Sequence, residues 1–92
     1  MSYSIELTIE AISDIKKFRK SGDKKALIKI DKLLDELRDH PTTGTGRPEL
    51  LKYYDIPTWS RRINDKHRLI YRIEDDKVIV IILSFWGHYG DK

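Results

Sequence analysis

TTGTGRP, residues 42–48, divides the chain into two parts with different hydrophobic patterns. Its threonines, glycines and proline are typical of a loop. Before it, apolar residues recur mainly at the spacing of amphipathic helices, and after it they follow the pattern of short strands. The order of elements on the two sides of this loop therefore decides the fold class.

A short strand and two helices are predicted before the loop. Residues 3–7 alternate apolar and polar side chains, as a strand with one buried face does. Thr8 and Asp23 are expected to cap two helices, which end at Ser21-Gly22 and His40-Pro41. The predicted apolar stripe of the first helix is Ile9, Ile12, Ile15 and Phe18, with Asp14 on the polar side, and that of the second is Leu27, Ile30, Leu33, Leu34 and Leu37.

Four strands are predicted after the loop, over residues 50–54, 59–63, 67–73 and 77–85, with turns at 55–57, 64–66 and 74–76. The unbroken apolar run at 78–83 indicates a central strand covered on both faces. The expected order is β-α-α-β-β-β-β in one domain, residues 1–92. The fold class is therefore α+β, an antiparallel sheet with a helical hairpin packed on one face.

Composition limits the kinds of function. The chain has 92 residues, of which 39% are hydrophobic and 36% charged. It has no apolar run near the roughly 20 residues of a membrane-spanning helix, and its start does not resemble a secretory signal. With no cysteine and three scattered histidines, neither a disulfide nor a metal site is expected. We therefore expect a cytoplasmic protein with no membrane association, metal or cofactor.

Positive charge is concentrated in the segment that begins within the loop and ends at residue 72. Residues 44–72 contain seven Lys/Arg and three Asp/Glu, whereas the net charge of the whole chain is only +3. Such a local basic excess favours a phosphate-bearing partner.

Two arginines are expected to face each other across a hairpin. If residues 64–66 form a three-residue turn, Arg62 lies opposite Arg68. Facing arginines repel each other, so the pair makes sense if an anion lies between or above them. The alternative is that both are solvent-facing strand residues paired with acidic neighbours, namely Asp55, Asp65 or Glu74.

RNA cleavage by internal transfer needs a base, cationic donors and an acid, and these residues could supply all three. Glu49 is a candidate base and His88 a candidate acid, while Tyr89 could contact a base or a phosphate. Taken singly, each has a simpler interpretation as a loop or tail residue. His67 is predicted to be structural, and Trp59 and Tyr71 are predicted to be core aromatics.

Four motifs together resemble the YoeB-type (Txe/YoeB) toxins of the RelE superfamily. They are GTGRPELLK at 44–52, WSRRI at 59–63, HRLIY at 67–71 and the pair His88-Tyr89. The resemblance implies a RelE-like fold and a ribosome-dependent endoribonuclease, an mRNA interferase of a type II toxin–antitoxin system. The implied partners are mRNA in the A site of the 70S ribosome with its 16S rRNA, a YefM/Phd-like antitoxin, and a second copy in a homodimer.

The same resemblance implies roles for individual residues. Glu49 corresponds to the general base, Arg68 to the arginine that stabilises the transition state, His88 to the general acid and Tyr89 to the tyrosine that helps hold the RNA. The predicted RNA- or phosphate-binding residues are Lys52, Arg62 and Arg61, although strand alternation points Arg61 away from the other two arginines.

The chain departs from the family pattern near its end. Phe85-Trp86-Gly87 stands where an arginine usually precedes the His-Tyr pair, and Gly90-Asp91-Lys92 follows the pair. Two other functions stay open from the residues: a ParE-like toxin that binds DNA gyrase, and a basic RNA- or ribosome-binding module without catalysis. The joint presence of Glu49, Arg68 and His88 favours the nuclease.

Overall fold

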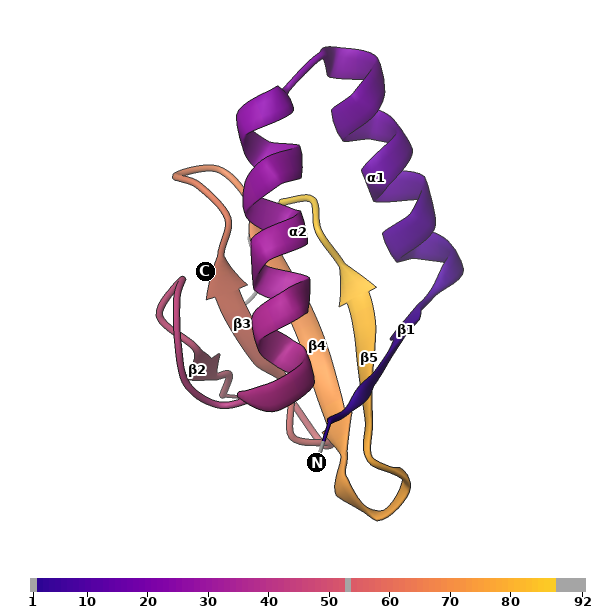
Figure 1. The fold of residues 1–92 in the computed structure, drawn as a ribbon, viewed down its shortest axis with the longest axis vertical. Coiled ribbons are helices and arrows are strands. Elements are labelled where there is room, and N and C mark those ends of the chain that lie inside the picture. The colour runs from indigo at the N-terminus through magenta and orange to yellow at the C-terminus, as the bar shows by residue number, and fades with distance from the viewer. Residues whose placement is uncertain (1, 53, 88–92) are drawn as a thin grey trace.

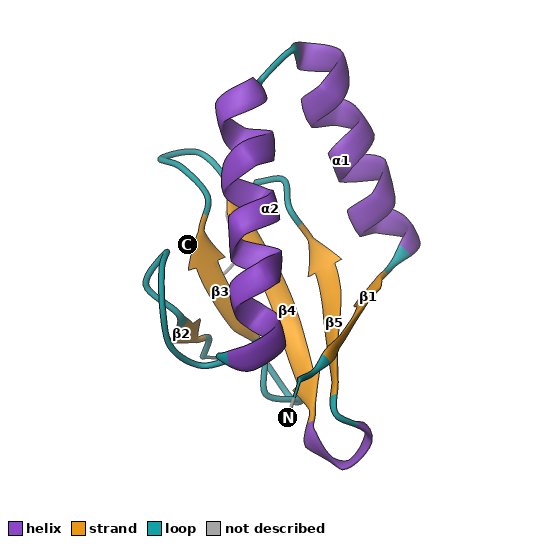
Figure 2. Cartoon of the chain, in the orientation of Figure 1, coloured by secondary structure: helices purple, strands orange, loops and turns teal. Residues whose placement is uncertain are grey.

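The chain folds in the predicted order of elements (Figures 1 and 2). The structure is a computed structural model that describes residues 2–52 and 54–87. The elements are β1 (Ser4–Leu7), α1 (Ile9–Ser21), α2 (Lys24–Asp39), β2 (Glu49–Leu50), β3 (Trp59–Arg62), β4 (Arg68–Glu74), the 3-10 helix η1 (Asp75–Lys77) and β5 (Ile79–Ser84). Both helices cover one face of the sheet (Figure 1). The predicted α+β class is confirmed.

The helix ends are where the capping residues predict them. Thr8 Oγ1 accepts a hydrogen bond from the Ala11 amide at 3.1 Å, and Asp23 Oδ1 accepts one from the Ala26 amide at 3.1 Å. Each cap satisfies an amide that has no partner within its helix. Gly22 ends α1 in the left-handed conformation, at φ 73°.

The buried face of α1 differs from the prediction. Ile9 is 88% exposed and Ile12 44% exposed, whereas Ala11, Asp14 and Phe18 are buried. The carboxylate of Asp14 accepts a hydrogen bond at 2.9 Å from the amide of Phe85, just beyond β5. This contact needs Asp14 on the sheet side of the helix, so the prediction from hydrophobic spacing was wrong for Ile9, Ile12 and Asp14. It is confirmed for Phe18, which is buried, and for Ile15, which packs against the core. The predicted α2 stripe is confirmed, because Ile30, Leu33 and Leu37 are buried and Leu27 and Leu34 pack against the core.

The sheet has the order β1-β5-β4-β3-β2. Strands joined by hairpins pair antiparallel, but β1 pairs parallel with β5. The expected antiparallel sheet is therefore mixed at one edge, since no hairpin sets the direction of β1. The central strand is β4, not β5. In β5, Val80 and Ile82 are fully buried, whereas Ile79, Ile81 and Leu83, on the other face of the strand, are only partly buried. The expectation that this strand is covered on both faces was therefore wrong.

The first strand after the loop is much shorter than expected. The prediction was residues 50–54, but β2 contains only Glu49 and Leu50. One further backbone bond, from the Leu51 amide to the Thr58 carbonyl at 2.8 Å, continues the pairing before the chain turns away. The other strands lie close to their predicted positions.

The core lies between the helices and the sheet, where buried residues of both helices form one cluster with Leu69, Tyr71, Val80 and Ile82. The opposite face of β2, β3 and β4 is covered by neither α1 nor α2 (Figure 1). Within residues 2–52 and 54–87, no helix is long and apolar enough to cross a membrane.

Candidate functional site

The β3–β4 hairpin places Arg62 directly opposite Arg68, as predicted. Asn64 Oδ1 stabilises the turn by accepting hydrogen bonds from the amides of Lys66 and His67, at 2.9 and 2.8 Å. The Arg68 guanidinium donates to the backbone carbonyls of Asn64 and His67, at 2.9 and 3.3 Å. The turn therefore fixes both the register and the direction of Arg68.

Glu49 lies on the same face of the sheet as the two arginines. It pairs with Ser60, which pairs in turn with Ile70. Because side chains alternate along a strand, Ser60 shares its face with Arg62, two residues further along β3. Glu49 and the two arginines thus reach one surface, on the side away from the helices.

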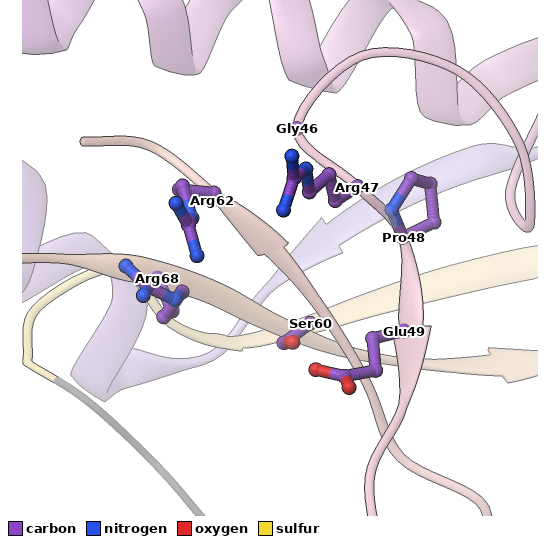
Figure 3. Close-up of a pocket in the computed structure, with 7 residues that line it drawn as sticks. All are labelled: Gly46, Arg47, Pro48, Glu49, Ser60, Arg62 and Arg68. Carbon is purple, nitrogen blue, oxygen red and sulfur yellow. The ribbon is translucent and has the colours of Figure 1, made fainter. Parts of the chain in front are cut away.

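These side chains line a pocket of about 300 Å³ (Figure 3). Its lining residues are Gly46, Arg47, Pro48, Glu49, Ser60, Arg62 and Arg68. The three guanidinium groups lie toward one end, and the carboxylate of Glu49 lies beside Ser60 toward the other. The pocket is at the small end of the size range of ligand sites.

The pocket has an excess of positive charge. It contains three arginines and one carboxylate, and no ion pair within the described ranges involves any of the four. The alternative pairing of the arginines with Asp55, Asp65 or Glu74 is not observed; Glu74 instead pairs with Lys77 at 3.7 Å. Clustered guanidinium groups repel one another, and a bound phosphate would remove this cost while accepting paired hydrogen bonds.

Arg61 does not belong to this surface. The prediction grouped it with the phosphate-binding residues, but its side chain is fully buried on the helix side of β3. Its guanidinium donates to the carbonyls of His40, Thr43 and Thr45 and pairs with Glu36 Oε1 at 3.1 Å. Strand alternation sends Arg61 inward for the same reason that it sends Arg62 outward, so Arg61 cannot contact a ligand in the pocket.

Buried Arg61 instead holds the loop that forms one wall of the pocket. Glu36 Oε1 also accepts a hydrogen bond from the Thr45 amide at 2.7 Å. This hydrogen bond and, to a lesser extent, the charge of Arg61 keep the pKa of the Glu36 carboxyl below its ordinary value. Tyr71 completes the cluster: its hydroxyl accepts from Arg61 Nε and donates to the Pro41 carbonyl at 2.7 Å, and burial raises its pKa.

Gly46 is required where the loop meets β3. Its φ is +87°, and a Cβ there would lie 2.9 Å from the carbonyl oxygen of Arg62. The Gly46 carbonyl accepts a hydrogen bond from the Arg62 amide at 2.6 Å. This close approach joins the loop to the strand that carries Arg62, and it positions Arg47, Pro48 and Glu49 along the pocket wall.

The other predicted site residues are Lys52, His88 and Tyr89. Lys52 is exposed and is not among the residues lining the pocket. His88 and Tyr89 lie outside the described residues. The residue before them, Gly87, accepts a hydrogen bond from the Arg68 amide at 3.0 Å.

His67 is structural, as predicted. Its Nδ1 accepts a hydrogen bond from the Gly87 amide at 2.9 Å, and its ring contacts Phe18 and Trp86. The core assignments of Trp59 and Tyr71 are also confirmed, since Tyr71 is fully buried and Trp59 packs against the core.

Sequence reasoning did not single out Arg47 as a site residue. Arg47 lies two positions before Glu49, inside the segment with the basic excess, so local charge was the available signal. Among the described residues, no group of three or more His, Cys, Asp or Glu side chains is placed to hold a metal ion.

Solved structures share this fold closely. A YoeB dimer from Staphylococcus aureus is 36% identical to this chain, with a TM-score of 0.81 over 97% of this chain and 100% of that one. A YoeB-YefM heterotetramer from the same organism gives 37% identity and a TM-score of 0.78 over the same shares. This similarity assigns the fold to a class of protein: small α+β toxins of bacterial toxin–antitoxin systems.

The sequence identifies the family within this class. "Toxin YoeB" of Escherichia coli (strain K12) is 39% identical over 67 residues, which are 73% of this chain and 77% of that protein. A sequence profile described as "YoeB-like toxin of bacterial type II toxin-antitoxin system" matches residues 7–89. The chain belongs to this YoeB-like toxin family. The predicted resemblance is confirmed, and the ParE-like alternative is not favoured.

Proposed function

We propose that this protein is a ribosome-dependent endoribonuclease that cuts mRNA in the A site and so inhibits translation in the cytoplasm. The observation that carries the proposal is the pocket in which Arg62 faces Arg68 and Glu49 lies on the same sheet face. Family membership supports it, because it places the chain among toxins of type II toxin–antitoxin systems.

The chemistry needs a base, cationic donors and an acid. Glu49 takes the proton from a ribose 2′-hydroxyl, and the 2′-oxygen forms a bond to the adjacent phosphorus. Arg68 and Arg62 stabilise the additional negative charge on the phosphoryl oxygens. The bond from phosphorus to the 5′-oxygen breaks, and that oxygen takes a proton. These steps need no metal ion.

His88 is the proposed acid, and Tyr89 the residue that helps hold the RNA. Their assignment rests on the resemblance of the terminal His-Tyr motif. The described residue that precedes them, Gly87, supports it by accepting a hydrogen bond from the Arg68 amide at 3.0 Å. Lys52, exposed after β2, is proposed to contact RNA beyond the pocket rather than within it.

Two protein partners are proposed. The first is a YefM-like antitoxin, supported by the YoeB-YefM complex from S. aureus. The second is another copy of this chain, supported by the YoeB dimer from the same organism. The 16S rRNA of the 70S ribosome is the proposed surface that positions the mRNA against the pocket.

Primer extension on mRNA in a programmed ribosome tests the activity. The wild-type chain should produce a cut within the A-site codon, and Glu49→Gln should abolish it while leaving ribosome binding largely intact. Glu6→Gln, a change of an exposed carboxylate on β1, is the matched control and should cut normally. A Glu49→Gln variant that cuts at the wild-type rate would refute Glu49 as the base.

The same protein preparations separate the other two functions. Inhibition of gyrase supercoiling without any RNA cut would indicate a ParE-like toxin. Ribosome binding without a cut by the wild-type chain would indicate a binding module without catalysis.

A further inference from the structure

Arg47 has an unfavourable backbone conformation. Its φ is +53°, and only one other non-glycine residue in the described ranges, Val78, has a positive φ. L-residues avoid this region because the Cβ crowds the backbone, and such residues are enriched at functional sites. Arg47 therefore requires an explanation that an ordinary loop residue does not.

Contacts of the Arg47 side chain with the protein do not provide that explanation. The side chain is exposed, and within residues 2–52 and 54–87 it takes part in no hydrogen bond or ion pair. The backbone on both sides is constrained instead. The Gly46 carbonyl accepts a hydrogen bond from the Arg62 amide, and Glu49 is paired with Ser60 in the sheet.

The conformation directs the guanidinium of Arg47 into the pocket. Figure 3 shows Arg47 on the loop side, near Arg62, with Arg68 across the hairpin. Arg62 and Arg68 face each other and are suited to bind one phosphate between them. A third guanidinium from the opposite wall is suited to a second anionic group.

We propose that Arg47 binds a second backbone phosphate of the mRNA, next to the phosphate held between Arg62 and Arg68, and that its strained conformation is retained for this purpose. The inference rests on the proposed function. In this role Arg47 positions two successive nucleotides of the mRNA and takes no part in proton transfer. The expected loss on substitution is therefore in binding and not in the rate of the bound complex.

Arg47→Asn separates function from folding, because asparagine tolerates the left-handed region better than arginine and carries no charge. We expect its thermal midpoint to be equal to or above that of the wild type. In programmed ribosomes, the toxin concentration for half-maximal cutting should rise about five- to tenfold, while the rate at saturation stays unchanged. The logarithmic salt dependence of that concentration should fall by about 0.7, as expected for one lost phosphate contact with a single strand.

Three control variants complete the experiment. Arg47→Lys retains the charge and should keep most of the wild-type salt dependence. Val78→Asn changes the other non-glycine residue with a positive φ in the described ranges, which is not among the residues lining the pocket, and should leave cutting unchanged. Arg68→Gln should lower the rate at saturation, in contrast to Arg47→Asn.

Ribosomes carrying mRNA truncated after the P-site codon identify the phosphate. If Arg47 contacts mRNA, the affinity difference between wild type and Arg47→Asn should disappear on these ribosomes. An equal difference on full and truncated mRNA would assign the contact to ribosomal RNA and overturn the inference.

Two further results would also be decisive. Unchanged half-maximal concentration and salt dependence in Arg47→Asn, with Arg68→Gln impaired, would overturn the inference and leave the proposed nuclease standing. Absence of cutting by the wild-type chain would overturn both.

Discussion

Arg61 and Arg62 are adjacent in sequence and have opposite environments. Arg61 is fully buried and is hydrogen-bonded to three loop carbonyls, whereas Arg62 is exposed in the pocket. A buried charge is tolerated only with near-complete pairing, and Glu36 with the loop carbonyls provides it. At the scale of single residues, one arginine organises the pocket wall and the next is available to a ligand.

Arg61→Lys should lower the free energy of unfolding by about 3 kcal/mol, since a single ammonium group cannot replace the planar fork that reaches all these acceptors. Urea denaturation at neutral pH measures the loss. Arg62→Lys is the matched control and should change stability by no more than about 0.5 kcal/mol. Equal losses in the two variants would contradict the structural role of Arg61.

Glu36→Gln should make stability less dependent on pH. Because the pKa of Glu36 is lowered in the folded protein, its carboxylate stabilises the fold above the unfolded-state pKa, and this contribution is lost as the pH falls through the folded-state pKa. At pH 7 the variant should be less stable by about 1.5 kcal/mol, the order of a hydrogen bond to a charged group.

Urea midpoints measured stepwise from pH 7 to pH 3 test this expectation. The difference in urea midpoint between the wild type and Glu36→Gln should become smaller as the pH falls. Asp35→Asn, whose side chain is 85% exposed, is the control and should show a small effect throughout. A gap that stays constant over this range would show that ionisation of Glu36 does not contribute.

At the scale of elements, the loop from α2 to β2 is held in position by specific contacts, as the β3–β4 hairpin is. Arg61 holds the loop from beneath, and Gly46 approaches the backbone of Arg62 closely enough to exclude a side chain. The arginine-bearing strand and the loop therefore form one unit. A substitution in the loop should therefore alter the geometry of the pocket even where it removes no charged group.

Gly46→Ala should destabilise the protein more than Gly22→Ala. Both glycines have a left-handed backbone, which costs alanine about 1 kcal/mol. A Cβ at Gly22 would meet nothing within 4 Å, whereas one at Gly46 would lie 2.9 Å from the Arg62 carbonyl. Thermal unfolding of both variants makes the comparison, and a loss at Gly46 no larger than at Gly22 would argue against the close approach.

At the scale of the whole molecule, the two faces of the sheet have separate tasks. One face packs against both helices and supplies the core, and the other presents the pocket of about 300 Å³. If the proposed function holds, a pocket this small can contact only a short stretch of RNA, and most of the substrate positioning must come from elsewhere. The proposed source is the ribosome.

Free RNA should therefore be a poor substrate. At equal toxin concentration, we expect the cutting of a naked transcript to be at least about a hundredfold slower than the cutting of the same message in a programmed ribosome, because positioning accounts for a large part of catalysis. Gel analysis of both reactions over time gives the ratio. Comparable rates on the two substrates would show that the pocket alone positions the RNA.

Much of this architecture could be predicted from local pattern. The caps at Thr8 and Asp23, the glycine after α1 and the turn at 64–66 depend on neighbours a few residues away, so their signals are local. The facing pair Arg62 and Arg68 follows from that turn and the two-residue period of strands. The burial of Asp14 depends on a partner 71 residues away, which hydrophobic periodicity does not reveal.

The sequence by itself determined the α+β class, the order of elements and the family, because hydrophobic period, turn residues and motifs are properties of short segments. Only the tertiary structure decided the parallel pairing of β1, the burial of Arg61 and the presence of Arg47 in the pocket. Each of these depends on distant segments meeting across the sheet or the loop. A charged side chain becomes a ligand contact or a structural support according to which face of the fold it reaches, and the packing of the whole chain sets that face.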